Sequence, residues 1–93
     1  HPGFVRIDSW VHIGENCTVL PMVLFGRAHP IEGTEIFVGD NCYVGTGATI
    51  LGPIRIGNNV TIAAGAVVTK DVPDNVVVAG VPAKIVKYKN CRL

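Results

Sequence analysis

Aliphatic residues recur at every sixth position over most of this chain. The repeat runs from Ile7 to Val19, with Phe25 opening one more unit, and it resumes from Val38 to Val68. A period of six matches neither the 3.6-residue period of a helix nor the two-residue period of a hairpin strand. It is typical of a coil in which short strands alternate with turns. The repeat therefore predicts an all-β fold of stacked coils.

Each six-residue unit combines inward-facing residues with a turn. The leading Ile or Val is expected to point inward, and the Gly and Asn that follow it, as in Val38-Gly39-Asp40-Asn41, tolerate the positive φ of a tight turn. Three units give one triangular turn of eighteen residues, and successive turns stack their strands in parallel. The fifth place of each unit must be small because it also faces inward; its occupants are Cys17, Cys42, Ala48, Val60 and Ala66.

The repeat also predicts how the domain is divided. A chain of 93 residues allows one small domain, and a domain of this size gains extra core by forming oligomers. The chain opens at His1 without an initiator Met, and its first coil would leave a strand edge uncovered, so we expect an N-terminal portion to precede it. Two runs of repeats, a projecting loop and a C-terminal cap are expected over residues 1–26, 38–73, 27–37 and 74–93 respectively.

Composition excludes several classes of partner. A formal net charge of +1 gives no reason to expect nucleic acid, although the last ten residues are locally basic. No apolar run reaches the roughly eighteen residues of a membrane span, and no secretory signal is present. Three cysteines without metal-ligand or redox spacing are typical of reduced thiols in a soluble, cytoplasmic protein. Cys17 and Cys42 are expected to be core residues, and Cys91 an exposed one.

The repeat resembles that of the hexapeptide-repeat family, whose fold is a left-handed parallel β-helix and whose members form trimers. The resemblance covers nearly the whole chain, and it alone implies the left hand, because the general rule for parallel crossovers favours the right hand. Val68-Thr69-Lys70-Asp71-Val72-Pro73, followed by Gly80-Val81-Pro82-Ala83-Lys84, looks like the ending of the acetyl-CoA-dependent members, among them serine, galactoside and maltose acetyltransferases. The resemblance therefore implies an O-acetyltransferase that needs no metal.

An acetyl transfer of this kind needs a general base, and histidine suits the task because its pKa is ordinarily near ~6.5. His1-Pro2-Gly3 looks like the start of the catalytic strand of serine acetyltransferases, and the interval from His1 to Phe25-Gly26 matches that family. His29, in Gly26-Arg27-Ala28-His29-Pro30, looks like the catalytic Gly-x-His-Pro loop of galactoside and maltose acetyltransferases. Both histidines are candidate bases, whereas His12, beside a turn, is expected to be an ordinary surface residue.

The resemblance also implies a cofactor site and an acceptor site. Thr46 and Ala64 match residues whose backbone lines the pantetheine groove of galactoside acetyltransferases, and a spacing of eighteen should stack them on one face. The residues matched to the nucleotide end of acetyl-CoA and to its phosphates are Thr69, Lys70, Lys84 and Lys87. The candidates for binding the acceptor are Arg27, Glu32 and Glu35, although Ala28 replaces the Arg that precedes the loop histidine in serine acetyltransferases.

The sequence leaves alternatives open. Serine, a sugar hydroxyl and a small xenobiotic all remain as acceptors, in a site formed between subunits of a homotrimer. One rival function is a zinc lyase of the γ-carbonic anhydrase kind, although the intervals between His1, His12 and His29 do not reproduce the ligand spacing of that class. The other rival is a non-catalytic trimeric scaffold, in which bound CoA is not expected.

Overall fold

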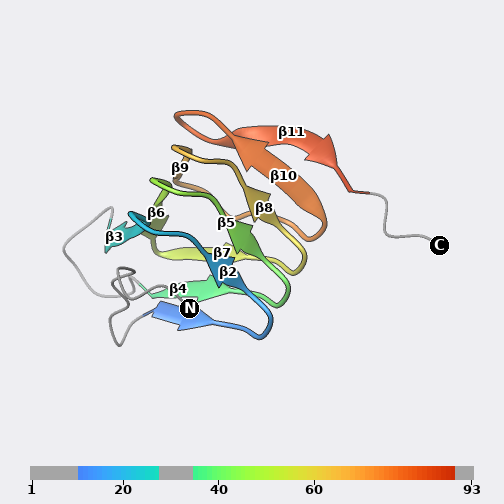
Figure 1. Cartoon of the computed structure of the whole chain (residues 1–93), viewed down its shortest axis with the longest axis horizontal. Coiled ribbons are helices and arrows are strands. Elements are labelled where there is room, and N and C mark those ends of the chain that lie inside the picture. The colour runs from blue at the N-terminus through green and yellow to red at the C-terminus, as the bar shows by residue number, and fades with distance from the viewer. Residues whose placement is uncertain (1–10, 28–34, 90–93) are drawn as a thin grey trace.

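The computed structural model describes residues 11–27 and 35–89, which wind into a coil of stacked turns (Figure 1). Within these residues every regular element is a β-strand, and the strands form three sheets. Along the chain the strands visit the three sheets in rotation until the last two strands, so each turn of the coil contributes one strand to each face. The prediction of three six-residue units per turn is confirmed.

The sheets are called A, B and C, with strands given in hydrogen-bonded order. Sheet A contains β1 (Val11–Ile13), β4 (Ile36–Val38) and β7 (Ile54–Ile56). Sheet B contains β11 (Lys84–Tyr88), β10 (Val76–Ala79), β8 (Thr61–Ile62), β5 (Tyr43–Val44) and β2 (Thr18–Val19). Sheet C contains β3 (Leu24–Arg27), β6 (Thr49–Gly52) and β9 (Val67–Val68). All neighbouring strands are parallel except β10 and β11.

The register of sheet B gives the length of each coil. Thr18 pairs with Tyr43, Tyr43 with Thr61, and Thr61 with Val77, so the successive steps are 43 − 18 = 25, 61 − 43 = 18 and 77 − 61 = 16 residues. The middle step equals the predicted eighteen. The first step is longer by seven, which is the number of residues in the segment 28–34 between the described parts of the chain. The insertion therefore leaves the stacking of the coils in register.

The inward column of the repeat forms the core. Leading residues such as Val44, Ile50 and Ile62 are fully buried, and so are the fifth-place residues Ala48 and Val60. Burying an aliphatic side chain of this size contributes roughly 1.5–3 kcal/mol, so each turn adds several such increments to the folded state. The inward orientation predicted from the six-residue period is confirmed.

Two of the three corners of the coil are built from turns with positive φ, but from different residue types. At the first, which we call the Asn corner, Asn16, Asn41, Asn59 and Asn75 have φ between 58° and 63°. At the second, the Gly corner, Met22, Gly47 and Gly65 have φ between 71° and 76°. Asn and Gly are the residues that tolerate this left-handed conformation best, which explains their place in the repeat.

The strands next to the inserted segment are longer than the sequence predicts. Residues 27–37 were expected to lie in one loop, but Arg27 ends β3, and Ile36 and Phe37 lie in β4. Ile36 is fully buried and pairs with Val11 and Ile54, so a core position outside the six-residue pattern extends the strand. The predicted loop boundaries are therefore too wide at both ends.

The C-terminal cap continues the coil before it reverses. β10 pairs in parallel with β8, as another rung of sheet B, and β11 then folds back antiparallel along β10 (Figure 1). All five residues of β11 are exposed, so this strand covers the edge of the last coil without entering the core. In the described ranges no helix has the length and apolar character that crossing a membrane requires.

Candidate functional site

Several of the predicted site residues lie outside the described residues. His1, His29 and Glu32 are among them, so both candidate bases and one candidate acceptor residue stay predictions. Arg27 is described as the last residue of β3, where its backbone is in register with Gly52 of β6. β3 therefore ends beside the corner where β6 passes into β7.

The Gly corner brings Thr46 and Ala64 together as the spacing of eighteen predicts. The Gly65 N–H donates to the Thr46 carbonyl at 3.0 Å, so the two turns stack directly on each other, and both Thr46 and Ala64 are exposed. A Cβ on Gly45 would lie 2.6 Å from the Ala64 backbone nitrogen, so only glycine permits this approach. The result is a strip of bare backbone with small side chains along two coils.

A hollow of about 320 Å³ at the cap end, which we call the cap pocket, contains three more of the predicted residues. The turn at residues 80–83 lies on one side of the pocket and is held to Val67 by two backbone hydrogen bonds. The Val67 N–H donates to the Gly80 carbonyl at 3.0 Å, and the Ala83 N–H donates to the Val67 carbonyl at 2.7 Å. The pocket is lined by Val68, Thr69, Lys70, Asp71, Val72, Val78, Pro82, Ala83, Lys84 and Ile85.

The cap pocket carries two cations but not the third that was predicted. Thr69, Lys70 and Lys84 line it, whereas Lys87 does not. Lys87 is exposed on β11 opposite Val77, beyond a register irregularity between Val77 and Val78, so it lies further along the cap strand. Lysine ammonium groups in a partly apolar hollow are suited to hold a phosphate.

Glu35 lies on the outer face of sheet A and faces His12, a contact that the repeat does not predict. The Glu35 Oε1 is 3.6 Å from the His12 Nε2, and both side chains are about half exposed. The His12 ring stacks on Phe37 with centroids 4.7 Å apart and an interplanar angle of 11°, and the Arg55 guanidinium carbon lies 4.9 Å from the centroid of the same ring. His12 is a surface residue as expected, but it belongs to a cross-coil stack.

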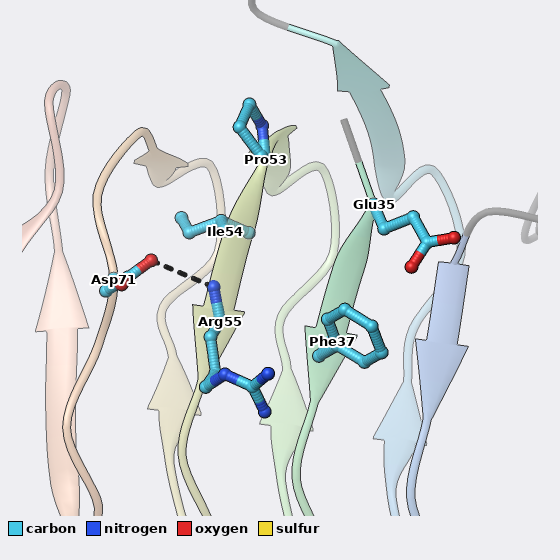
Figure 2. A pocket seen from close by; sticks show the side chains of 6 residues that line it. All are labelled: Glu35, Phe37, Pro53, Ile54, Arg55 and Asp71. Carbon is cyan, nitrogen blue, oxygen red and sulfur yellow. Dashed lines mark hydrogen bonds between the residues drawn. The ribbon is translucent and has the colours of Figure 1, made fainter. Parts of the chain in front are cut away.

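Next to this stack lies a second hollow, which we call the sheet A hollow, of about 570 Å³ (Figure 2). The Asp71 Oδ1 accepts a hydrogen bond from the Arg55 backbone N–H at 2.9 Å, drawn as the dashed line in Figure 2. The Arg55 side chain extends from β7 toward the Phe37 side (Figure 2). The residues that line the hollow are Glu35, Phe37, Pro53, Ile54, Arg55 and Asp71. Asp71 also lines the cap pocket, so the two hollows meet at this residue.

Cys42 is a core residue, as predicted, whereas Cys17 is half-buried and packs against the core. The Cys17 thiol donates to the Gly39 carbonyl at 3.1 Å, and the Cys42 thiol donates to the Gly57 carbonyl at 3.2 Å. Burial raises the pKa of the Cys42 thiol above its usual value, which keeps it protonated at neutral pH. A protonated, buried thiol is a poor nucleophile. In the described residues no three His, Cys, Asp or Glu side chains converge as metal ligands would.

The coils described above resemble those of known transferases. Residues 35–70 match the family described as bacterial transferase hexapeptide (six repeats). The chain is 40% identical over 77 residues to the 2,3,4,5-tetrahydropyridine-2,6-dicarboxylate N-acetyltransferase of Staphylococcus aureus, a match that covers 83% of this chain and 30% of that protein. The chain therefore spans less than a third of the length of that curated relative.

Solved acetyltransferase structures share the fold. A serine acetyltransferase from Brucella abortus superposes with a TM-score of 0.84 at 36% identity, over 96% of this chain and 36% of that one. A galactoside acetyltransferase in complex with coenzyme A superposes with a TM-score of 0.79 at 35% identity, over 86% of this chain and 46% of that one. The fold is thus the parallel left-handed β-helix that the resemblance to the hexapeptide-repeat family implied.

Proposed function

The chain belongs to the hexapeptide-repeat family of bacterial transferases, and from that premise we propose that it forms part of an acetyl-CoA-dependent acetyltransferase. The acetyl group passes directly to a hydroxyl of a small acceptor, such as serine or a sugar. The protein acts as a homotrimer with its active sites between subunits. It works in the cytoplasm, without a metal ion.

One observation carries the proposal: Thr69, Lys70 and Lys84 line a single hollow at the cap, while Thr46 and Ala64 form an open strip on the same stack of coils. The cap pocket offers two ammonium groups to a phosphorylated nucleotide. At Thr46 to Gly47 and Ala64 to Gly65 the Gly corner offers backbone with only small side chains, as a flexible pantetheine arm requires for close approach. The structural match to a galactoside acetyltransferase in complex with coenzyme A supports this assignment.

His1 or His29 is the proposed general base. The base takes the proton of the acceptor hydroxyl as the oxygen attacks the thioester carbonyl, and a proton then goes to the departing thiolate of CoA. Much of the acceleration comes from holding the two substrates together. Cys42 takes no part in the proposed reaction because its thiol is buried and protonated. Arg27, Glu32 and Glu35 are the proposed acceptor-binding residues, and the contact between Glu35 and His12 favours an orienting role for Glu35.

Transfer to an amine is the second candidate. The relatives from Staphylococcus aureus that are 40% identical to this chain are N-acetyltransferases, whereas the serine and galactoside enzymes are neighbours in structure. An amine acceptor would use the same CoA site and the same base. The two candidates therefore differ in the acceptor alone.

A thiol-release assay with acetyl-CoA tests the proposal. The protein is assayed against a panel of hydroxyl and amine acceptors, and the assay is repeated on the His1→Ala and His29→Ala variants. Loss of one base should lower turnover by about 10²–10⁴-fold. If neither variant is slowed at least tenfold, the histidine assignment is wrong. Calorimetric titration with CoA addresses the scaffold alternative, because a scaffold should not bind it.

A further inference from the structure

Along the Gly corner, the first coil differs from the next two. Met22 occupies in the first coil the place that Gly47 and Gly65 occupy in the second and third, and all three residues have φ between 71° and 76°. The Gly47 N–H donates to the Pro21 carbonyl at 3.4 Å, so the first coil stacks on the second at this corner. A strip that is bare backbone along two coils therefore ends at a long side chain.

Met22 and Leu24 form an exposed apolar patch at this end of the strip. Met22 is 74% exposed and Leu24 is 51% exposed, whereas Val23 between them is buried, so the alternation of the chain holds both side chains on the outside. Every residue from 19 to 25 is uncharged. Methionine pays a steric cost in the left-handed region that glycine avoids in the next coils, so folding alone does not favour it here.

The direction of a bound acyl-CoA follows from the charges at the other end of the stack. The cap pocket with Lys70 and Lys84 lies at the last coil, and the patch of Met22 and Leu24 lies on the first (Figure 1). In the proposed complex the nucleotide occupies the cap pocket, and the pantetheine arm passes along the Gly corner toward the first coil. The group that continues beyond the sulfur at that end is the acyl chain.

We propose that Met22 and Leu24 form an acyl-binding surface, and that the protein takes straight-chain acyl groups longer than acetyl, such as butyryl, from acyl-CoA. This inference rests on the proposed function and extends its donor from acetyl to short-chain acyl groups. The added methylenes lie against apolar side chains and lose contact with water, which stabilises the complex in proportion to the area covered. Methionine suits such a surface because its unbranched thioether adapts to ligands of different shape.

The chemical step keeps the same balance for a longer acyl group. The acceptor oxygen or nitrogen forms a bond to the thioester carbonyl carbon, and the bond from that carbon to sulfur breaks. The proton that the acceptor loses goes to the departing thiolate of CoA. Met22 and Leu24 act on the choice of acyl group and take no part in proton transfer.

The test compares the binding of acetyl-CoA and butyryl-CoA to the full chain by calorimetric titration without an acceptor, so that neither thioester is consumed. The wild-type protein should bind butyryl-CoA about fourfold more tightly, which is the gain expected when two methylenes are half covered. Met22→Gln keeps the length and flexibility of the side chain but makes its end polar, so the ratio should fall close to one. Met22→Gly should lower the ratio as well without lowering Tm, because glycine adopts the φ of 71° freely.

Val81→Gln is the matched control, because Val81 is an apolar residue that is 72% exposed in the turn at the cap end. It should keep the wild-type ratio. A ratio near one in the wild-type protein, or a wild-type ratio in both Met22 variants, would overturn the inference while binding of acetyl-CoA itself upholds the proposed function. A reduced ratio in Val81→Gln alone would place the acyl chain at the cap end and would also overturn it.

Light scattering on the same variants identifies the other possible occupant of the patch, a second copy of this chain. The molar mass of Met22→Gln should equal that of the wild-type protein. A lower molar mass together with a lost ratio would assign the patch to contact between subunits and overturn the inference. Failure of the wild-type protein to bind either acyl-CoA would refute the proposed function as well.

Discussion

The Asn corner and the Gly corner have the same backbone turn but different surfaces. At the Asn corner a side chain of each coil accepts a hydrogen bond from the backbone of the coil before it. The Asp40 Oδ1 accepts from the Glu15 N–H at 2.8 Å, and the Asn58 Oδ1 accepts from the Asp40 N–H at 2.7 Å. The Asp74 Oδ1 accepts from the Asn58 N–H at 2.8 Å in the same way. At the Gly corner the equivalent places hold small residues. One corner is closed by its side chains, and the other stays open.

This difference separates stability from binding within one repeat. The closed corner satisfies backbone N–H groups that the coil would otherwise leave to water, and each bond adds a modest net increment. Among the described residues, the open corner has one side-chain hydrogen bond between coils, in which the Thr46 hydroxyl donates to the Pro21 carbonyl at 2.6 Å, and the turn residues Gly47 and Gly65 are exposed. Changes at the Asn corner should therefore alter stability, and changes at the Gly corner should alter binding.

The largest effect is expected from filling the open corner. Ala64→Trp places a large ring on an exposed turn of the proposed pantetheine site, so we expect CoA affinity to fall by about a hundredfold or more with little change in Tm. Glu15→Trp is the matched control, because Glu15 is an exposed turn residue at the Asn corner and should leave CoA affinity unchanged. Calorimetric titration of both variants measures the contrast. Similar losses in the two variants would mean that the corners do not differ in binding.

The next effect concerns the positive φ of 59° at Asn41. Asn41→Ala should destabilise the fold by roughly 1–2 kcal/mol, because alanine pays a steric cost in the left-handed region. Asn41→Gly should be nearly neutral, since glycine adopts the same conformation freely. For a domain of this size 1 kcal/mol corresponds to about 4–8 °C in Tm, which thermal unfolding resolves. Equal Tm values for the two variants would show that the turn conformation is not what selects asparagine here.

A smaller effect is expected from removing one bond of the closed corner. Asn58→Ala deletes the acceptor of the Asp40 N–H, and because this contact is exposed, water replaces part of the lost bond. We expect a loss of about 0.5–1 kcal/mol of stability and an unchanged affinity for CoA. Chemical denaturation gives the free energy of unfolding, and titration gives the affinity. A clear loss of CoA affinity would place a ligand at the closed corner.

The smallest effect is a dependence of stability on alkaline pH. Burial raises the pKa of Cys42, so above about pH 8.5 a cysteine in the unfolded chain loses its proton before Cys42 does in the folded chain. The unfolded state then binds fewer protons, and stability falls as pH rises through this window. Cys42→Val removes the thiol and introduces valine, the residue found at the same place one coil later as Val60. Between pH 8 and pH 10 the Tm of this variant should fall by roughly a degree or two less than the Tm of the wild-type protein. Identical pH profiles would argue against this cause.

The sequence predicted the interior of the coil well and its exterior poorly. The six-residue period sets which residues face inward, because each leading Ile or Val must fill the same column. The outer stack of His12, Phe37 and Arg55 depends on register, and the step from His12 to Phe37 is 25 residues instead of eighteen. Without the length of the insertion, the sequence gives no sign that these three side chains meet.

Within the candidate site, too, the positions inside the repeat were predicted better than those outside it. Thr46 and Ala64 were predicted as a stacked pair, and they stack because no insertion falls between their coils. Lys84 and Lys87 both stay predicted phosphate ligands; Lys84 lines the cap pocket and Lys87 does not, since β11 turns back antiparallel with an irregular register that the repeat does not encode. Ile36 was assigned to a loop because it precedes the resumed repeat by two residues, although it fills a core position of sheet A.

The most direct test of the open corner is an NMR titration of the isotopically labelled protein with acetyl-CoA, followed through the backbone amides of both corners. We predict large shifts at Thr46, Ala64 and Gly65 and at Lys84 of the cap pocket, with little change at Asn41, Asn59 and Asn75. Shifts centred on the Asn corner, or an absence of shifts at saturating acetyl-CoA, would contradict it.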